Sequence, residues 1–175
     1  MIKPRSYLTM AKLSTQRVVK IAIIAALYAV FTIAIAPISY GPIQFRVSEI
    51  LKVFVLFDPY TALGIGIGTF FANLASPFVS PWELVWMPLT DMAGGVVAWG
   101  IYILLRKRWP VIPLTIYALT TGSAVGLMLY MFGSGGIWFL IGAVSVSELV
   151  ILLGGIPIIF GIVRIVKTRG LKFLD

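Results

Sequence analysis

Long apolar stretches, separated by short polar or proline-containing breaks, run along the whole chain. A helix needs about 20 apolar residues to cross a bilayer. The sequence offers six candidate runs, at about 18–36, 47–57, 60–75, 82–105, 113–132 and 137–166. We therefore predict an all-α integral membrane protein with six transmembrane helices in a single domain, residues 1–175. The second run is short and contains Glu49 and Lys52, which leaves open whether it spans the membrane fully.

Basic residues gather in three places: before the first run, at Arg106–Arg108, and after the last run. Loops rich in Lys and Arg stay on the cytoplasmic side of a membrane. All three clusters share that side if four spans precede Arg106 and two follow it. The charge pattern thus predicts cytoplasmic N- and C-termini in the cell membrane. No small-residue cleavage site follows the first apolar run, so we expect this run to be retained rather than removed as a signal peptide.

The composition argues against several classes of function. The chain is 60% hydrophobic and only 11% charged, and its mean hydropathy is +1.04. The net charge of +8 is explained by the membrane-flanking clusters, so we expect no nucleic-acid partner. The chain has no Cys and no His, and it shows no nucleophile elbow and no phosphate-binding loop. We therefore predict no enzymatic activity, no metal site and no cofactor, and any ATPase must lie on another subunit.

The predicted topology places the breaks at 37–46, 76–81 and 133–136 together on the outer face. Polar and aromatic side chains concentrate near these breaks, and carboxylates at membrane depth are usually functional. A small-molecule pocket combines aromatic walls with a few convergent polar groups. The candidate binding residues are Gln44, Arg46, Glu49, Asn73, Trp82, Glu83, Trp86, Trp138 and Glu148.

Several of these residues have simpler explanations. Glu49 can form a salt bridge with Lys52 or Arg46 instead of contacting a ligand, and Glu83 can interact with a helix dipole. The three tryptophans fit an interfacial belt as well as ring stacking. Glu148 has no basic neighbour within a helical turn. Asp91 can serve packing or bond to the backbone.

Small residues also recur at helical spacing. Ala22, Ala25, Ala26 and Ala29 form a flat stripe on the first helix. Such a stripe allows another helix to approach closely, either within the bundle or from a separate subunit. The series Gly64, Gly66 and Gly68 is explained by close helix packing rather than by nucleotide binding, because no strand precedes it.

The segment Ala36-Pro37-Ile38-Ser39-Tyr40-Gly41-Pro42-Ile43-Gln44-Phe45-Arg46-Val47-Ser48-Glu49 resembles the signature of the QueT family, the proposed queuosine-precursor carriers. The stretch Asn73-Leu74-Ala75-Ser76-Pro77 at the end of the third run strengthens this likeness. The chain also resembles the substrate-binding (S) component of an energy-coupling factor transporter in its length, its six apolar runs and its alanine stripe.

The resemblance implies high-affinity capture of a 7-deazaguanine, such as 7-aminomethyl-7-deazaguanine or queuine, from outside the cell. It also implies partners, namely a membrane coupling subunit that docks on the alanine stripe and two ATPase subunits, besides the surrounding membrane lipid. Two alternatives remain. One is the same fold with another cargo, such as a flavin or thiamin, and the other is a membrane scaffold without a ligand.

Overall fold

A computed structural model describes residues 14–41 and 43–169, and these residues form helices and connecting turns without strands. The elements are α1 (Thr15–Ala34), α2 (Ala36–Ser39), η1 (Val47–Leu56), α3 (Thr61–Asn73), η2 (Trp82–Trp86), α4 (Met87–Leu104), α5 (Val111–Met131) and α6 (Ile137–Thr168). Here η1 is a 3₁₀ helix and η2 is a single π-helical turn that leads directly into α4. The predicted all-α class is confirmed.

Four helical stretches are long and apolar enough to cross a membrane: α1, η2 with α4, α5 and α6. α3 has 13 residues and η1 has 10, which correspond to about 20 Å each at the rises of α and 3₁₀ helices. Both are shorter than the hydrocarbon core of about 30 Å. The protein is thus a multi-pass membrane protein, while the number of six full spans stays a prediction.

The second apolar run forms the centre of the bundle. η1 contacts α1, α3, α4 and α6, and all but two of its ten residues are buried. Pro37 is the second residue of the short turn α2, and Gln44 adopts a left-handed backbone conformation with φ of 53° before the chain enters η1. Since 3₁₀ runs longer than three or four residues are uncommon, a 3₁₀ helix of this length is unusual and sits where the polar residues converge.

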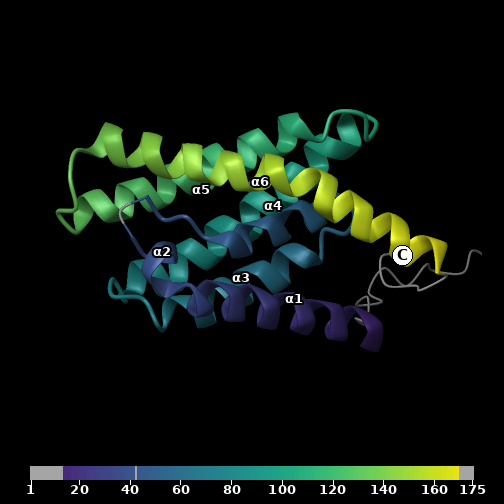
Figure 1. The fold of residues 1–175 in the computed structure, drawn as a ribbon, viewed down its shortest axis with the longest axis horizontal. Helices are drawn as coiled ribbons and strands as arrows, with labels where there is room; N and C mark the ends of the chain where they lie inside the picture. The colour runs from purple at the N-terminus through teal and green to yellow at the C-terminus, as the bar shows by residue number, and fades with distance from the viewer. Residues whose placement is uncertain (1–13, 42, 170–175) are drawn as a thin grey trace, which may run out of the picture.

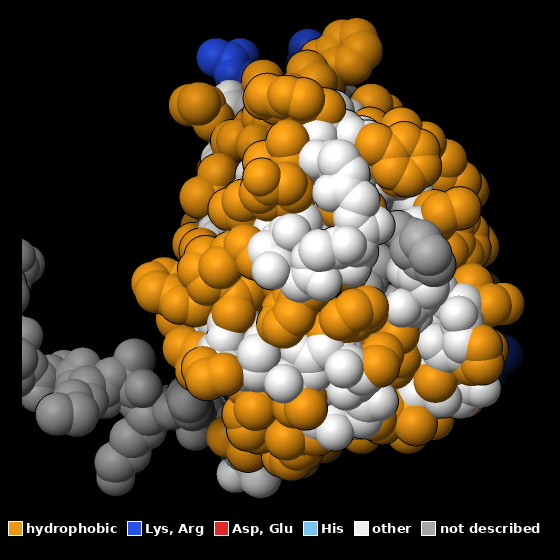
Figure 2. All heavy atoms as spheres, turned by 90° about the vertical axis from the view of Figure 1, so that its left-hand side faces the viewer, with side chains coloured by type: hydrophobic (Ala, Val, Ile, Leu, Met, Phe, Trp, Pro, Cys, Tyr) orange, Lys and Arg blue, Asp and Glu red, His pale blue; other side chains and the backbone are white. Residues whose placement is uncertain are grey.

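The two ends of the bundle carry different connections (Figure 1). The turn between α5 and α6, the turn around α2 and the connection from α3 to η2 lie at one end. The start of α1, the end of α6 and the basic turn between α4 and α5 lie at the other. Figure 2 looks onto the first end, where apolar side chains dominate and no Asp or Glu side chain is visible. This arrangement agrees with the predicted grouping of loops. The basic residues Lys3, Arg5, Lys12 and Lys172 lie outside the described residues.

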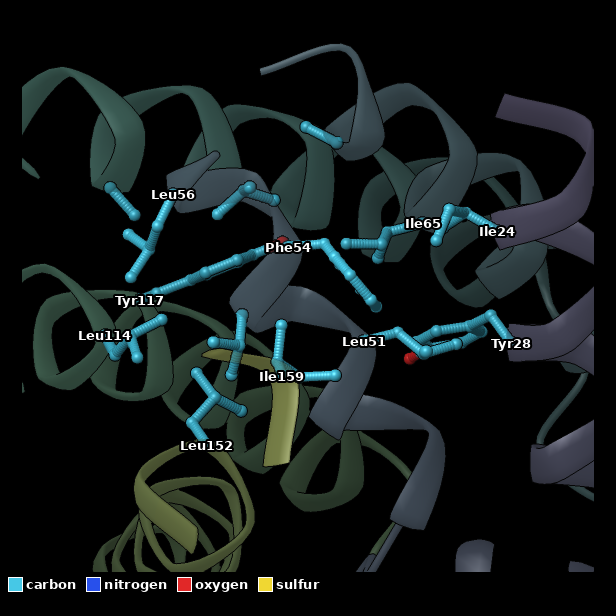
Figure 3. Close-up of a cluster of buried hydrophobic side chains, with 14 of the residues drawn as sticks. Ile24, Tyr28, Leu51, Phe54, Leu56, Ile65, Leu114, Tyr117, Leu152 and Ile159 are labelled. Atoms are coloured by element: carbon cyan, nitrogen blue, oxygen red, sulfur yellow. The ribbon is translucent and has the colours of Figure 1, made fainter. Parts of the chain in front are cut away.

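The apolar core connects α1, η1, α3, α5 and α6 (Figure 3). Glycines bring the helices together: a Cβ atom at Gly64 would lie 2.8 Å from the Ile21 carbonyl oxygen of α1, and one at Gly68 would lie 2.7 Å from Tyr28 Cβ. A Cβ atom at Gly66 would meet Met92 of α4. The predicted packing role of this glycine series is confirmed.

Candidate functional site

A buried lysine lies at the centre of the molecule, among three carboxylates from three different elements. The Nζ atom of Lys52 in η1 forms an ion pair with Glu49 one turn away and lies 2.8 Å from Asp91 Oδ1 of α4. Both carboxylate oxygens of Glu148 in α6 lie 3.4 Å from the same Nζ atom. Of the two basic partners considered for Glu49, the structure pairs it with Lys52, and Glu148 finds its basic partner 96 positions away.

Neighbouring helices hold this cluster in place. Tyr28 of α1 donates its hydroxyl hydrogen bond to Glu49, and Thr69 of α3 donates to Asp91 Oδ2 at 2.6 Å. The ring of Tyr117 in α5 faces the Lys52 ammonium, with 4.9 Å between Nζ and the ring centroid, a favourable cation–π distance. Uncharged side chains of α1, α3 and α5 thus hold in place the charged groups that η1 and α4 contribute to the cluster.

Arg46 organises a second polar cluster beside the first. Its guanidinium donates to Gln44 Oε1 at 2.9 Å, to Asn73 Oδ1 at 3.2 Å and to the Ser39 carbonyl at 3.3 Å. The nearest carboxylate oxygen of Glu83 lies 3.8 Å from Arg46 Nη2, which is within ion-pair range but too long for a hydrogen bond. Arg46 thus ties the segment before η1 to α3 and η2.

Tyr40 fastens the same segment from the other side. Its hydroxyl donates to the Ala72 carbonyl at 2.5 Å, and the Arg46 guanidinium carbon lies 5.2 Å from its ring centroid. Burial raises the pKa of the Tyr40 phenol above its ordinary value, so the hydroxyl stays protonated and keeps its role as a donor.

Several buried polar atoms around Arg46 have no hydrogen-bond partner among the residues that the structure describes. Glu83 is completely buried, yet neither carboxylate oxygen accepts a hydrogen bond. The Gln44 amide nitrogen, the Ser39 hydroxyl and the Trp82 indole nitrogen are likewise unpaired. Leaving such groups unsatisfied costs about 1–3 kcal/mol each. Unpaired donors and acceptors gathered in one place are typical of a site that a polar ligand completes.

A cavity lies between the two clusters. Its walls include Gln44, Arg46, Glu49, Lys52, Thr69, Met87, Thr90, Asp91, Thr121, Val125, Val144 and Glu148. The cavity has a volume of about 10 Å³, which is room for about one water molecule. A ring-sized solute therefore fits only after the surrounding side chains move apart.

Helical spacing explains how these walls form. Met87 and Asp91 lie four positions apart on α4, as do Thr121 and Val125 on α5 and Val144 and Glu148 on α6. Residues four apart share one face of an α-helix. Each of these three pairs therefore presents one apolar and one polar side chain to the cavity.

The predicted binding residues divide into two groups. Gln44, Arg46, Glu49 and Glu148 line the cavity, and Asn73 and Glu83 adjoin it through Arg46. The tryptophans do not line it. Trp82 packs against the buried cluster around Met87 and lies with its ring centroid 5.8 Å from that of Trp86, whereas Trp86 is 55% exposed and Trp138 is 82% exposed.

Sequence reasoning missed several members of the site. Lys52 was considered only as a partner of Glu49, and Asp91 only as a packing or backbone-bonded residue. The Asp91 carboxylate instead bonds Lys52 and Thr69, while its backbone carbonyl accepts from Tyr117. The available signal was the rarity of charged residues inside the apolar runs: Asp91 in the fourth run is as unusual as Glu49 in the second and Glu148 in the sixth.

The alanine stripe is split between two surroundings. Ala25 is buried against α3, where a Cβ atom on Gly68 would lie 2.8 Å from the Ala25 carbonyl oxygen. Ala22 and Ala26 are exposed, and Ala29 is half-buried. Internal packing therefore explains Ala25, while the other three remain accessible from outside the bundle.

The fold and the site define a multi-pass membrane protein whose apolar helical bundle encloses a polar, charged cavity. The model of the QueT transporter family matches residues 18–164, most of the chain. The chain belongs to the QueT transporter family and is a protein of the plasma membrane.

One relative extends this result. The "Queuosine precursor transporter QueT" of Lactococcus lactis subsp. cremoris (strain MG1363) is 44% identical over 69 residues. The match covers 38% of this chain and 41% of the relative, so it spans less than half the length of either protein. No solved structure matches the chain significantly.

Proposed function

We propose that this chain is the high-affinity substrate-binding subunit of an energy-coupling factor importer, and that its cargo is a queuosine precursor of the 7-deazaguanine class. The observation that carries this proposal is the charge of the cavity. Three carboxylates face one ammonium, and the cavity also contains an amide nitrogen without a partner, that of Gln44. A site with this excess of acceptors suits a solute rich in donors or carrying positive charge. The name of the Lactococcus relative points to the same class of cargo.

A 7-deazaguanine offers the matching groups. Its ring N1–H and exocyclic amine lie side by side, so that one carboxylate can accept both in a bidentate arrangement. The ring carbonyl can accept from the unpaired Gln44 amide, or from Arg46. An aminomethyl substituent is cationic and interacts best with a second carboxylate. Glu49, Asp91 and Glu148 line the cavity from three different elements and supply the carboxylates for both positions.

Energy for uptake must come from partners, because the sequence contains no Walker-type phosphate loop. We propose that a membrane coupling subunit with two ATPase subunits supplies it. The exposed residues Ala22 and Ala26 of α1, with the half-buried Ala29, form the docking face. Small residues there allow a partner helix to approach closely, and the remaining apolar surface contacts lipid.

Two other hypotheses make different predictions. A carrier of flavin or thiamin would retain the docking face but prefer another ring. A scaffold without a ligand would use its buried polar groups to bind one another. The unpaired atoms of Gln44 and Glu83 favour a carrier over a scaffold, and the excess of carboxylates disfavours a phosphate-bearing cargo.

The test is a tryptophan-fluorescence titration of the purified protein with 7-aminomethyl-7-deazaguanine, queuine, guanine, riboflavin and thiamin, with calorimetry as a second readout. Saturable binding of the deazaguanines alone supports the proposal. Saturation by riboflavin or thiamin instead would retain the carrier and reject the cargo. Absence of heat and of quenching with all five compounds would favour the scaffold.

A further inference from the structure

The cavity holds more negative than positive charge. Glu49, Asp91 and Glu148 surround a single ammonium, that of Lys52, which leaves an excess of two negative charges if every carboxylate is ionised. Among the other titratable groups of the described residues that face this cluster, Tyr28 and Tyr117 add no positive charge.

Arg46, at the edge of the cavity, does not remove the excess. It lies within ion-pair distance of Glu83, a fourth buried carboxylate, and it donates its hydrogen bonds to neutral oxygens. α3 contributes Thr69, which carries no charge. The imbalance is therefore a property of the whole site and not of one wall.

A buried carboxylate without a compensating charge is costly, and it becomes far less costly as the neutral acid. Among the three, Glu148 is held least firmly as an anion. Its oxygens lie 3.4 Å from Lys52, whereas Asp91 lies at 2.8 Å with a second bond from Thr69, and Glu49 has both the Lys52 ion pair and the Tyr28 hydroxyl.

We propose that Glu148 carries a proton in the empty site and releases it when a cationic solute binds. The inference rests on the function proposed above and adds its proton stoichiometry. The carboxylic acid of Glu148 loses its proton to the outside solution, and the resulting carboxylate pairs with the ammonium of the incoming solute. The unpaired amide nitrogen of Gln44 in the same cavity independently marks this space as a ligand site. The net charge of the buried site is therefore the same before and after the solute enters.

The exchange has a definite pH dependence. An alkylammonium resembles the lysine side chain, whose pKa is about 10.4, so the solute arrives already charged and the released proton comes from the protein. While Glu148 is protonated in the empty site, each unit of acidification should weaken binding of the cationic solute about tenfold. A neutral solute of the same shape should bind with an affinity that does not depend on pH.

Isothermal titration calorimetry of the full-length protein in two buffers of different ionisation enthalpy measures the number of protons. We expect 7-aminomethyl-7-deazaguanine to release about one proton per molecule bound, and 7-methyl-7-deazaguanine, which lacks the amine, to release none. Glu148→Gln, which resembles the neutral acid in shape, should bind the amine more weakly and release no proton. A binding enthalpy of the amine that is identical in both buffers would overturn the exchange, whereas lack of binding by either compound would count against the proposed cargo instead.

Infrared spectroscopy tests the protonated state without any solute. The empty protein at pH 7 should show the carbonyl band of a protonated carboxylic acid, and Glu148→Gln should remove it. Asp58→Asn is the matched control, because Asp58 is paired with Lys20 at 2.6 Å and its loss should leave the band unchanged. A band that persists undiminished in Glu148→Gln, or that is absent from the unmodified protein, would refute the assignment whatever the cargo proves to be.

Discussion

Replacing Lys52 by Met removes the only ammonium that the described residues place in the cavity, while keeping a side chain of similar length. Lys52 is 1% exposed, so water cannot replace it as a partner. Glu49, Asp91 and Glu148 would then face one another across a low-dielectric space. The substitution therefore leaves the carboxylates uncompensated without opening a large void.

The size of the effect follows from the burial of the ion pairs. Breaking a buried pair by removing one partner costs about 3–5 kcal/mol. For a chain of this size, 1 kcal/mol shifts the midpoint of thermal unfolding by about 2–4 °C. We therefore expect Lys52→Met to lower the midpoint by about 6–20 °C at pH 7, by the same two estimates. Lys167→Met is the matched control, because Lys167 is exposed in the last turn of α6 and should change stability by about 0.5 kcal/mol or less.

Thermal unfolding in detergent, followed by intrinsic fluorescence, measures this shift. Adding Asp91→Asn to Lys52→Met should restore part of the loss, since one uncompensated charge is removed and the two sites are in contact. If Lys52→Met unfolded at the same temperature as the unmodified protein, the ion-paired cluster would not stabilise the fold, and the electrostatic reasoning would fail.

Three further predictions concern packing, docking and fluorescence. Gly68→Ala should destabilise the protein by about 1–3 kcal/mol, because its Cβ atom would lie 2.7 Å from a side-chain atom of α1. Gly142→Ala is the control, because its Cβ atom would have no neighbour within 4 Å among the described residues. Thermal unfolding compares the two variants, and equal effects would contradict the proposed packing. Ala26→Leu should leave the unfolding midpoint unchanged but reduce co-purification with the coupling subunit, and unaltered co-purification would reject the docking face. Trp138→Phe should preserve the fluorescence change on binding of a deazaguanine, because Trp138 is 82% exposed. Trp82→Phe should reduce it, because Trp82 packs against the cluster that contains the wall residue Met87; the reverse result would place the solute elsewhere.

Much of the fold was accessible from the sequence because hydrophobic run length and glycine spacing are local signals. The four long runs became long helices, and Gly64 and Gly68 became the contact between α3 and α1. The run containing Glu49 and Lys52 was ambiguous, since its length fits neither a full span nor a loop. Its 3₁₀ form and its central position depend on contacts with four other helices, which no local pattern encodes.

The sequence predicted the part of the site whose residues lie close together along the chain. Gln44, Arg46 and Glu49 are close in sequence and interrupt an apolar pattern, so they were readily found. Glu148 was recognised as unusual, but its partner Lys52 is 96 positions away, beyond any helical periodicity. The tryptophans were wrongly predicted to line the cavity. Tryptophan is expected both in an interfacial belt and in a wall that stacks on a ring, so the sequence does not distinguish the two.

The central claim, that the cavity around Lys52 is the solute site, is tested most directly by the affinity of 7-aminomethyl-7-deazaguanine for Glu49→Gln and Glu148→Gln. Hydrogen bonds to charged groups contribute about 1.5–3 kcal/mol, so each substitution should weaken binding by about 10-fold to 150-fold. Lys167→Met provides the control for a charge change outside the cavity. Weaker binding to both cavity variants, with the control unaffected, is the predicted result, and unchanged affinity in both would contradict the account.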